Sequence, residues 1–419
     1  MTDEPRRVVI TGLGAVTPLG TDVASTWSRL VAGGSGIRPT QAFDPSRVAS
    51  RIAGEVPGFD ASHVLDRKEL RRNDRFTQFA LVASREAMLD AGLPERLEGD
   101  EADATGVLIG SGLGGIPTLM EQVAIWATRG PERLSPFFIP MVIANMASGQ
   151  VAISTGARGP NYAAVSACAS AGHAIGEAFE AILRGDAEMM LAGGSETPVH
   201  ETTVGGFSAM RALSTRNDDP AGSSRPFDAG RDGFVCAEGA ATLILEELGH
   251  AERRGARVLA ELCGYAATAD AHHITLPAPG GRGALRASRR ALEKARIDTS
   301  EVDVVSAHAT STPEGDAAEL QAIAALLGEH ASRASITATK SSIGHTLGAA
   351  GAIAAVVTVR TLIEGCVPPT LNLTDPDPAV GDLDCTPLTA RPRDARVALV
   401  NAFGFGGQNA CLVIRRWDA

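Results

Sequence analysis

The stretch that decides the fold is Asn161–Glu196, "NYAAVSACASAGHAIGEAFEAILRGDAEMMLAGGSE". Its apolar start, "YAAVSA", predicts a strand that turns at Cys168 into a helix ending near Gly185. The apolar face of this helix follows the i, i+3, i+4, i+7 spacing: Ile175, Ala178, Phe179 and Ile182. "AEMMLAGGSE" then predicts a second strand. Strand, helix and strand in this order are typical of α/β proteins.

The same order recurs along the chain. Further strands are predicted for seven segments: "RRVVITGLG", "TGVLIGSGLGG", "GAATLILEEL", "RVLAELCGYAATAD", "VDVVSAHAT", "ASITATK" and "RVALVNAFGFGG". "LRASRRALEKARI" predicts an amphipathic helix between them. The residues on either side of position 256 therefore look alike, and we predict two similar halves, 1–256 and 257–419. No repeat of 20–50 residues is visible, which argues against a solenoid.

The composition argues against several classes of protein. The 419 residues are 44% hydrophobic and 21% charged, as in ordinary globular proteins. A net charge of −11 argues against general nucleic-acid binding. The longest apolar run, Leu347–Val359, is too short to span a bilayer and predicts a buried helix. The start, "MTDEPRRVVITG", lacks the apolar segment of a signal peptide. We therefore expect a cytoplasmic protein with no membrane or nucleic-acid partner.

The cysteines are scattered, with no CxxC pair and no nearby Cys/His spacing of a zinc site. We therefore expect no disulfide, no structural metal and a reducing compartment. The six are Cys168, Cys236, Cys263, Cys366, Cys385 and Cys411.

Cys168 is a candidate nucleophile because it stands where the predicted strand turns into the helix. Backbone N–H groups and the helix dipole at such a position favour the thiolate. The same amides can stabilise an oxyanion on an attacked carbonyl. Small neighbours on both sides leave room for an extended substrate. The alternative is a small buried core residue, which is the usual fate of a free cysteine.

Three further candidates stand at ends of predicted strands. His308 follows "VDVVSA", and Lys340 and His345 follow "SITAT" in "ITATKSSIGHTLGAAG". A single histidine is more often a structural core residue. Two histidines and a cysteine, each beside Gly or Ser at the end of a strand, favour a shared site, because ligand sites form at the carboxyl ends of strands in α/β sheets.

Two glycine-rich segments complete the picture. In "NAFGFGGQN", Asn401–Asn409, glycines leave backbone N–H groups free beside two phenylalanines. The alternative there is a tight turn with core aromatics. "GSGLGG", Gly110–Gly115, formally matches the dinucleotide-binding pattern GxGxxG. It begins about 110 residues into the chain, and no acidic residue stands where a ribose would bind, so we do not assign it to a nucleotide.

Together these segments resemble the β-ketoacyl-acyl carrier protein synthases, the condensing enzymes of fatty acid and type II polyketide assembly, and most closely the elongating, long-chain class. The resemblance runs from "VVITGLGAVTPLG" through "GGFSAMRALSTRNDDP", "SRPFDAGRDGFV" and "AHATSTPEGDAAE" to "TKSSIGHTLGAAG" and "NAFGFGGQN". It implies a thiolase-like fold, five α/β/α/β/α layers made of two similar halves. It also implies a homodimer.

The resemblance implies decarboxylative condensation of malonyl-acyl carrier protein with an acyl chain on the cysteine, which extends a fatty acid or polyketide by two carbons. No metal or other cofactor is implied, since the substrates travel on the phosphopantetheine of acyl carrier protein. On this pattern Cys168 takes the acyl chain, His308 and His345 assist decarboxylation, and Lys340 supports the electrostatics. Phe405 matches the gating residue whose N–H joins the oxyanion hole. Contacts to the phosphopantetheine are implied for Thr310, Thr312, Phe403 and Gly406.

The sequence departs from the family pattern at three positions. Ala309 replaces a glycine, and we expect its methyl group to crowd the channel slightly. Ala354 replaces a glutamate that commonly pairs with the lysine, so another acid is expected to serve Lys340. Gln408 replaces the usual Thr or His after "GFGG". These differences favour a specialised synthase.

An acidic enzyme needs a local basic surface to bind an acidic carrier protein. "RKELRRNDR" places Lys68, Arg71 and Arg72 on one face of a predicted helix, and Arg211 resembles a second docking position. A solvated helix face is the alternative.

Two other functions fit parts of the sequence. A thiolase shares the nucleophile and condenses without decarboxylation, but thiolases normally use a second catalytic cysteine. A chain-length factor is a non-catalytic partner that lacks the nucleophile. The chain retains Cys168 and both histidines, so it fits the catalytic half of such a heterodimer better.

Overall fold

The computed structural model describes residues 6–418. Ten strands form one continuous mixed sheet in the order β10-β9-β13-β14-β8-β1-β7-β6-β4-β5. The N-terminal strands are β1 (Val8–Val16), β4 (Thr105–Gly110), β5 (Asn161–Tyr162), β6 (Met189–Glu196) and β7 (Gly239–Glu247). The C-terminal strands are β8 (Ala260–Ala269), β9 (Val304–Ser306), β10 (Ser335–Thr337), β13 (Val397–Gly404) and β14 (Gln408–Arg416).

The two sets of five strands pair in the same way. In the first, β5, β4 and β6 are parallel, and β6, β7 and β1 are antiparallel. In the second, β10, β9 and β13 are parallel, and β13, β14 and β8 are antiparallel. The two half-sheets join where Val8–Ile10 of β1 pairs with Ala260–Leu262 of β8. This repetition confirms the prediction of two similar halves, although the boundary at 256/257 remains a prediction.

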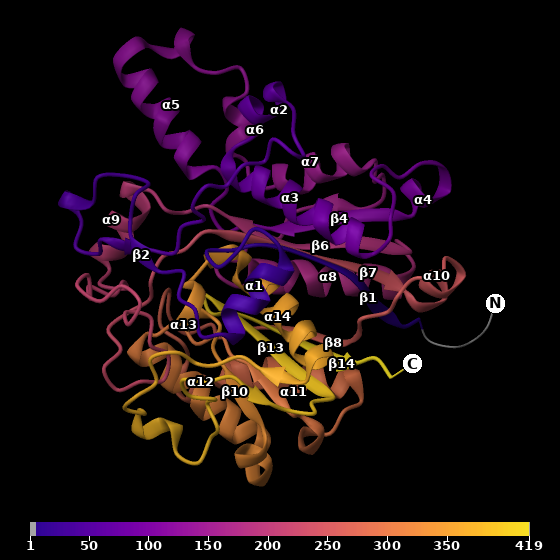
Figure 1. Cartoon of the computed structure of the whole chain (residues 1–419), viewed down its shortest axis with the longest axis vertical. Coiled ribbons are helices and arrows are strands. Elements are labelled where there is room, and N and C mark those ends of the chain that lie inside the picture. The colour runs from indigo at the N-terminus through magenta and orange to yellow at the C-terminus, as the bar shows by residue number, and fades with distance from the viewer. Residues whose placement is uncertain (1–5, 419) are drawn as a thin grey trace.

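Helices make three layers around the two half-sheets (Figure 1). α3 (Arg75–Asp90) and α7 (Met146–Thr155) cover the outer face of the N-terminal half-sheet. α8 (Ser170–Arg184) and α14 (Ala350–Glu364) lie between the half-sheets and contact strands of both. α11 (Arg282–Ala295) covers β8 and β14, with α12 (Pro313–Leu327) beside it. The predicted five-layered α/β/α/β/α architecture is confirmed.

The remaining α-helices lie outside these three layers. They are α1 (Val23–Val31), α2 (Arg67–Arg72), α4 (Gly99–Asp103), α5 (Ile116–Arg129), α6 (Phe138–Val142), α9 (Glu201–Ala209), α10 (Leu248–Arg253) and α13 (Lys340–Ile343). α5 projects from the body of the molecule, with α6 and α2 near its base (Figure 1).

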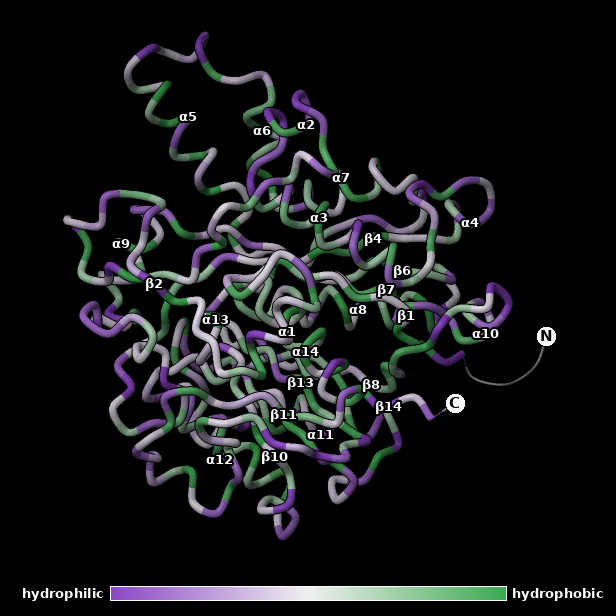
Figure 2. The backbone as a smooth tube through the Cα atoms, viewed as in Figure 1, coloured by the Kyte–Doolittle hydropathy of each residue, from purple (hydrophilic) through white to green (hydrophobic). Residues whose placement is uncertain are grey.

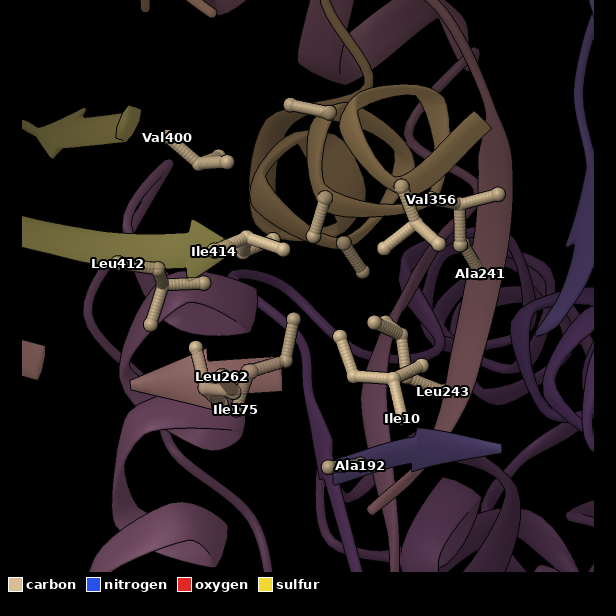
Figure 3. Packing of buried hydrophobic residues seen from close by; sticks show 14 of the residues in the cluster. Ile10, Ile175, Ala192, Ala241, Leu243, Leu262, Val356, Val400, Leu412 and Ile414 are labelled. Carbon is tan, nitrogen blue, oxygen red and sulfur yellow. The ribbon is translucent and has the colours of Figure 1, made fainter. Parts of the chain in front are cut away.

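The core is continuous through the middle layer (Figure 3). Ile10 and Leu243 of the N-terminal half face Val356 of α14, and Ile414 of the C-terminal half reaches the same helix. Small residues allow the close approach: a Cβ added at Gly351 of α14 would lie 2.8 Å from the backbone nitrogen of Gly172 in α8. The abundance of Ala and Gly around the predicted nucleophile therefore has a packing cause.

The predicted apolar helix is part of this middle layer. Residues Leu347–Glu364 are long and apolar enough to cross a membrane by length and composition, but 83% of this segment is buried inside the fold. Its apolar side chains therefore pack in the hydrophobic core, as expected for the central helix of a layered protein.

One predicted strand is wrong. "YAAVSA" was expected to extend up to the cysteine, but β5 ends at Tyr162 and Val165 is 60% exposed. Two bonds from the side chain of Ser170 close a turn instead: its Oγ accepts from the amide of Ser166 (2.9 Å) and donates to the carbonyl of Ala167 (2.6 Å).

Candidate active site

Cys168 lies at the tip of a strained turn. The preceding Ala167 has φ = 51°, a left-handed conformation that non-glycine residues rarely adopt. Ala169 is the N-cap residue of α8, which begins at Ser170, so Cys168 lies just before the helix as predicted. The turn brings the sulfur in front of the first turn of a helix, where free backbone amides point outward.

The segment Phe403–Phe405 crosses directly over this turn. A Cβ added at Gly404 would lie 2.7 Å from the Ser166 carbonyl oxygen and 3.2 Å from the Cys168 nitrogen, so only glycine fits there. The close approach places the backbone N–H groups of Cys168 and Phe405 at the sulfur, where both stabilise its anionic form. The two amides matched to the oxyanion hole are therefore brought together.

The two amides lower the pKa of the Cys168 thiol, as expected for this position, but burial outweighs them in the resting protein. Burial raises the pKa of the Cys168 thiol to about 12, which exceeds the lowering by the charge of Lys340 and by the two amides. The thiol is therefore protonated at neutral pH, and acyl transfer from a thioester requires that its proton be accepted by a nearby group.

The rings of His308 and His345 lie edge to face, with centroids 5.5 Å apart and planes at 87°. The ring of Phe403 lies 5.5 Å from that of His308. Within residues 6–418, neither imidazole has a hydrogen-bond partner, and Nδ1 of each is buried. Burial and the charge of Lys340 hold the pKa of both rings well below its usual range. Both are therefore neutral near pH 7, each with one N–H donor and one acceptor nitrogen.

Lys340 is buried behind the histidines, where its Nζ donates to the carbonyl oxygen of His308 (2.5 Å). Burial lowers its pKa to about 8, and the charge of Glu319 is the largest effect opposing that shift. Glu319 in turn accepts from the amides of His308 (2.8 Å) and Ala309 (2.7 Å). Ala354 is buried on α14 and has no carboxylate to offer. Glu319 is therefore the acid that serves Lys340 in place of the missing glutamate.

The thiol, both imidazoles and Glu319 line one cavity of about 430 Å³, whereas Lys340 lies outside its lining. Its lining includes the predicted residues Cys168, His308, His345, Phe403, Phe405, Thr310, Thr312 and Arg211. The hydroxyls of Thr310 and Thr312 lie 3.0 Å apart at the start of α12. The spatial grouping expected from the strand ends is thus present.

Two expected contacts with the channel are absent. Gly406 is exposed and does not line the cavity, because its amide donates to the carbonyl of Ile274 (2.8 Å) and turns the loop outward. Ala309 does not crowd the channel either. Its φ is 28°, and its side chain is buried in the core of the C-terminal half.

The predicted docking residues occupy separate places. Lys68, Arg71 and Arg72 are exposed on α2, as expected, but none of them lines the cavity. The Arg72 guanidinium lies 4.7 Å from the ring of Phe137, beside α6. Only Arg211 reaches the cavity mouth.

Glu196, at the end of β6, was missed by the sequence reasoning. Its buried carboxylate accepts from the Ser111 hydroxyl (2.8 Å) and the amides of Gly112 (2.6 Å), Leu113 (3.0 Å) and Gly348 (3.0 Å). It thereby joins the "GSGLGG" loop to the turn after His345. Two amides of this loop bind a carboxylate of the protein itself, which agrees with the decision not to assign the loop to a nucleotide. The sequence offered one signal for this role: a glutamate at the end of the apolar strand "AEMMLAGGSE".

Replacing Glu196 with glutamine is expected to accelerate alkylation of Cys168 by iodoacetamide about two- to tenfold at pH 8. The negative charge of Glu196 raises the pKa of Cys168, so its removal lowers that pKa, and one unit is tenfold in thiolate. The rate should be followed from pH 7 to 10. Glu246→Gln, a buried glutamate paired with Arg254, is the matched control. Equal profiles for the wild type and Glu196→Gln would contradict this coupling.

Comparison with known proteins agrees with this geometry. Residues 5–251 match the family profile "Beta-ketoacyl synthase, N-terminal domain", and residues 259–374 match the C-terminal domain. The chain is 49% identical to 3-oxoacyl-[acyl-carrier-protein] synthase 2 of Synechocystis over 99% of both sequences.

Solved structures give the same result. A type II polyketide ketosynthase in complex with its acyl-carrier protein has a TM-score of 0.89 and 35% identity, covering 99% of this chain and 100% of that one. The ishigamide ketosynthase/chain length factor has a TM-score of 0.91 and 32% identity with the same coverage. Profile matches over most of the chain and near-complete alignment to these proteins show that the chain belongs to the β-ketoacyl synthase family.

Proposed function

We propose that this chain condenses a malonyl thioester with an acyl chain held on Cys168, releasing CO2 and forming a 3-oxoacyl thioester two carbons longer. The observation that carries the proposal is the grouping of one thiol, two neutral imidazoles and two backbone amides in a single cavity. The Synechocystis relative is a 3-oxoacyl-[acyl-carrier-protein] synthase, which supports acyl carrier protein as the thioester carrier and fatty acid elongation as the setting.

Acyl transfer comes first. The Cys168 proton passes to a neutral imidazole, the sulfur attacks the acyl carbonyl, and the amides of Cys168 and Phe405 donate to the resulting oxyanion. Collapse of this intermediate breaks the bond to the carrier thiol, which leaves with a proton. The reaction exchanges one thioester for another and needs no redox partner.

Condensation follows when a malonyl thioester enters. Loss of CO2 leaves an enolate, whose oxygen accepts hydrogen bonds from His308 and His345. Neutral rings are suited to this task because they donate without surrendering a full proton. The enolate carbon attacks the acyl-Cys168 carbonyl, the new carbon–carbon bond displaces the thiolate, and one proton restores the thiol.

Lys340 acts in this scheme as a positioning residue. Its ammonium group holds the carbonyl of His308, and its charge helps to keep both rings neutral. Thr310 and Thr312 offer hydroxyls to the amides of the carrier's phosphopantetheine arm. Each step balances with thioesters and these side chains, so the proposal includes no metal ion or redox cofactor.

The direct test is the choice of extender. With an acyl chain on the enzyme, a malonyl-carrier should give product and an acetyl-carrier should give none, because only malonyl can form the enolate by losing CO2. Efficient use of acetyl-carrier would instead identify a thiolase. Among the described residues, those that line the cavity do not include the second cysteine that a thiolase normally uses.

We further propose a homodimer that forms through residues 113–165. Eight of the fourteen large apolar side chains exposed on the described residues belong to this segment. They are Leu113, Val123, Trp126, Ile139, Ile143, Ile153, Tyr162 and Val165. The segment includes the projecting α5 and α6 (Figure 2) and the edge strand β5, whose unpaired backbone can join a second sheet.

The purified chain should therefore have twice the monomer mass of 43.2 kDa by light scattering. Trp126→Glu combined with Ile153→Glu should raise the dimer dissociation constant at least about 30-fold, since each change buries a charge at the interface. Ile363→Glu, an exposed apolar residue outside the segment, is the control. A wild type that is monomeric alone and dimerises only with a co-expressed ketosynthase-like chain would favour a heterodimer with a chain length factor, the partner of the ishigamide ketosynthase.

A further inference from the structure

His173 links the helix after the nucleophile to the turn that carries it. Its Nδ1 lies 2.6 Å from the hydroxyl oxygen of Ser166, which precedes Cys168 by two residues. Ser166 is buried, whereas His173 is half-buried near the start of α8. Neither residue lines the active-site cavity, so neither is placed to touch a substrate. This hydrogen bond is therefore a feature of the turn that the chemistry proposed above does not use.

The backbone of Ser166 closes the nucleophilic turn. Its amide donates to the Ser170 hydroxyl (2.9 Å), and its carbonyl accepts from the amide of Ala169 (3.1 Å). The next residue, Ala167, has the left-handed φ of 51°, and such a strained conformation persists only where the surrounding contacts enforce it. The hydrogen bond from the Ser166 side chain to His173 fixes the residue before the strained one. It therefore adds a side-chain restraint to a turn whose backbone is under strain.

The same end of α8 packs against the strands that flank the second amide of the oxyanion hole. A Cβ added at Gly172 would lie 2.9 Å from the Cβ of Ala402 on β13. Burial lowers the pKa of the adjacent His173 ring, whereas Glu177 and the backbone of Asn409 on β14 raise it. The ring is therefore neutral near pH 7 and lies between the nucleophilic turn and the β13–β14 hairpin. A neutral imidazole has one N–H and one acceptor nitrogen, so it can bind both segments at once.

We propose that His173 is a positioning residue that keeps the Cys168 turn aligned with the segment Phe403–Phe405, so that the amides of Cys168 and Phe405 point at the same oxyanion. The inference rests on the proposed function and adds to it a residue outside the cavity. The two amides come from different halves of the chain, so contacts between the halves must hold them in register. A displacement of about 1 Å at such a site can lower the rate about 100-fold.

Two substitutions remove this hydrogen bond from opposite sides. Ser166→Ala deletes the hydroxyl, whereas His173→Phe keeps an aromatic ring against Tyr265, whose ring centroid lies 6.5 Å away. Each should lower the rate of acyl transfer to Cys168 at saturating thioester about 10- to 100-fold, with little change in KM, because the binding surface is intact. The double variant should be no slower than the slower single variant, because both changes remove one interaction. His173→Asn should recover most of the rate, since its side-chain amide can take the place of Nδ1 and bind the Ser166 hydroxyl.

Alkylation separates this role from a general loss of structure. Iodoacetamide reacts with the sulfur and forms no oxyanion in the site, so its rate with Cys168 should change at most about threefold in both single variants. Ser84→Ala is the matched control, because it removes another buried hydroxyl from a hydrogen bond, to Thr242 (3.1 Å), outside the cavity lining. This control should transfer acyl chains at the rate of the wild type.

Acyl transfer in Ser166→Ala and His173→Phe at the rate of Ser84→Ala would overturn the positioning role. Equal losses of acyl transfer and alkylation would also overturn it, because the turn as a whole would then be displaced and not the alignment of the two amides. The same holds if His173→Asn is no faster than His173→Phe. A wild type that forms no acyl-Cys168 with an acyl thioester would instead overturn the proposed function.

Discussion

Cys168→Ala is expected to lower acyl transfer by at least about 10⁴-fold, because the variant has no atom that can form the covalent intermediate. The fold should persist, since the thiol borders the cavity and alanine is common in this layer. Ala167 and Ala169 already flank the position, so the strained turn tolerates a methyl group. Acyl transfer should be followed by intact-protein mass after incubation with an acyl thioester.

Cys236→Ala is the matched control, because Cys236 is a buried thiol in the same small hydrophobic cluster that the partly buried Cys168 packs against. Burial and the nearby acids raise the pKa of the Cys236 thiol, and Cys236 does not line the cavity, whereas Cys168 does. An epoxide-type alkylator should therefore label Cys168 first. Acylation that survives in Cys168→Ala, or primary labelling of Cys236 or Cys411, would contradict the assignment of the nucleophile.

His308→Ala and His345→Ala are each expected to lower condensation about 10²- to 10³-fold, the usual loss for one donor to a developing oxyanion. Acylation of Cys168 should fall much less, since the two backbone amides that bind its oxyanion remain. The two losses should be compared by measuring single-turnover rates of acylation and of CO2 release in the same preparation.

The pH dependence gives a second check on the histidines. Their pKa values lie well below the usual range, so both rings are neutral from pH 6.5 to 8.5 and condensation should vary little with their titration there. Condensation should fall at more acidic pH as the rings gain protons. Equal losses of acylation and condensation in either variant would contradict the role of that ring as a donor to the enolate.

Much of the fold could be predicted because its signals are local. The apolar spacing after Cys168 predicts α8, and its end at Gly185 follows from the left-handed cap that glycine favours. The repeated strand–turn–helix order predicts two similar halves. The ends of strands also locate His308, His345 and Lys340, because side chains there share one edge of each sheet.

What could not be predicted depends on contacts distant in sequence. Glu196 and Glu319 act through amides of other segments, which no spacing reveals. The pKa of Cys168 depends on how completely the surrounding layers exclude water, and this outweighs the helix position that the sequence shows. The extended "YAAVSA" was misjudged because two hydrogen bonds of Ser170 close a turn within it.

The central claim is that one cavity both holds the acyl chain on Cys168 and drives carbon–carbon bond formation by loss of CO2. The most direct measurement is a single turnover in which enzyme loaded with an acyl chain is mixed with malonyl-carrier protein labelled with ¹³C in its free carboxylate. We predict that acyl-Cys168 disappears at the rate at which labelled CO2 and unlabelled 3-oxoacyl product appear, in equal amounts. Product that retains the label, or loss of the acyl chain from Cys168 without matching CO2, would contradict the account.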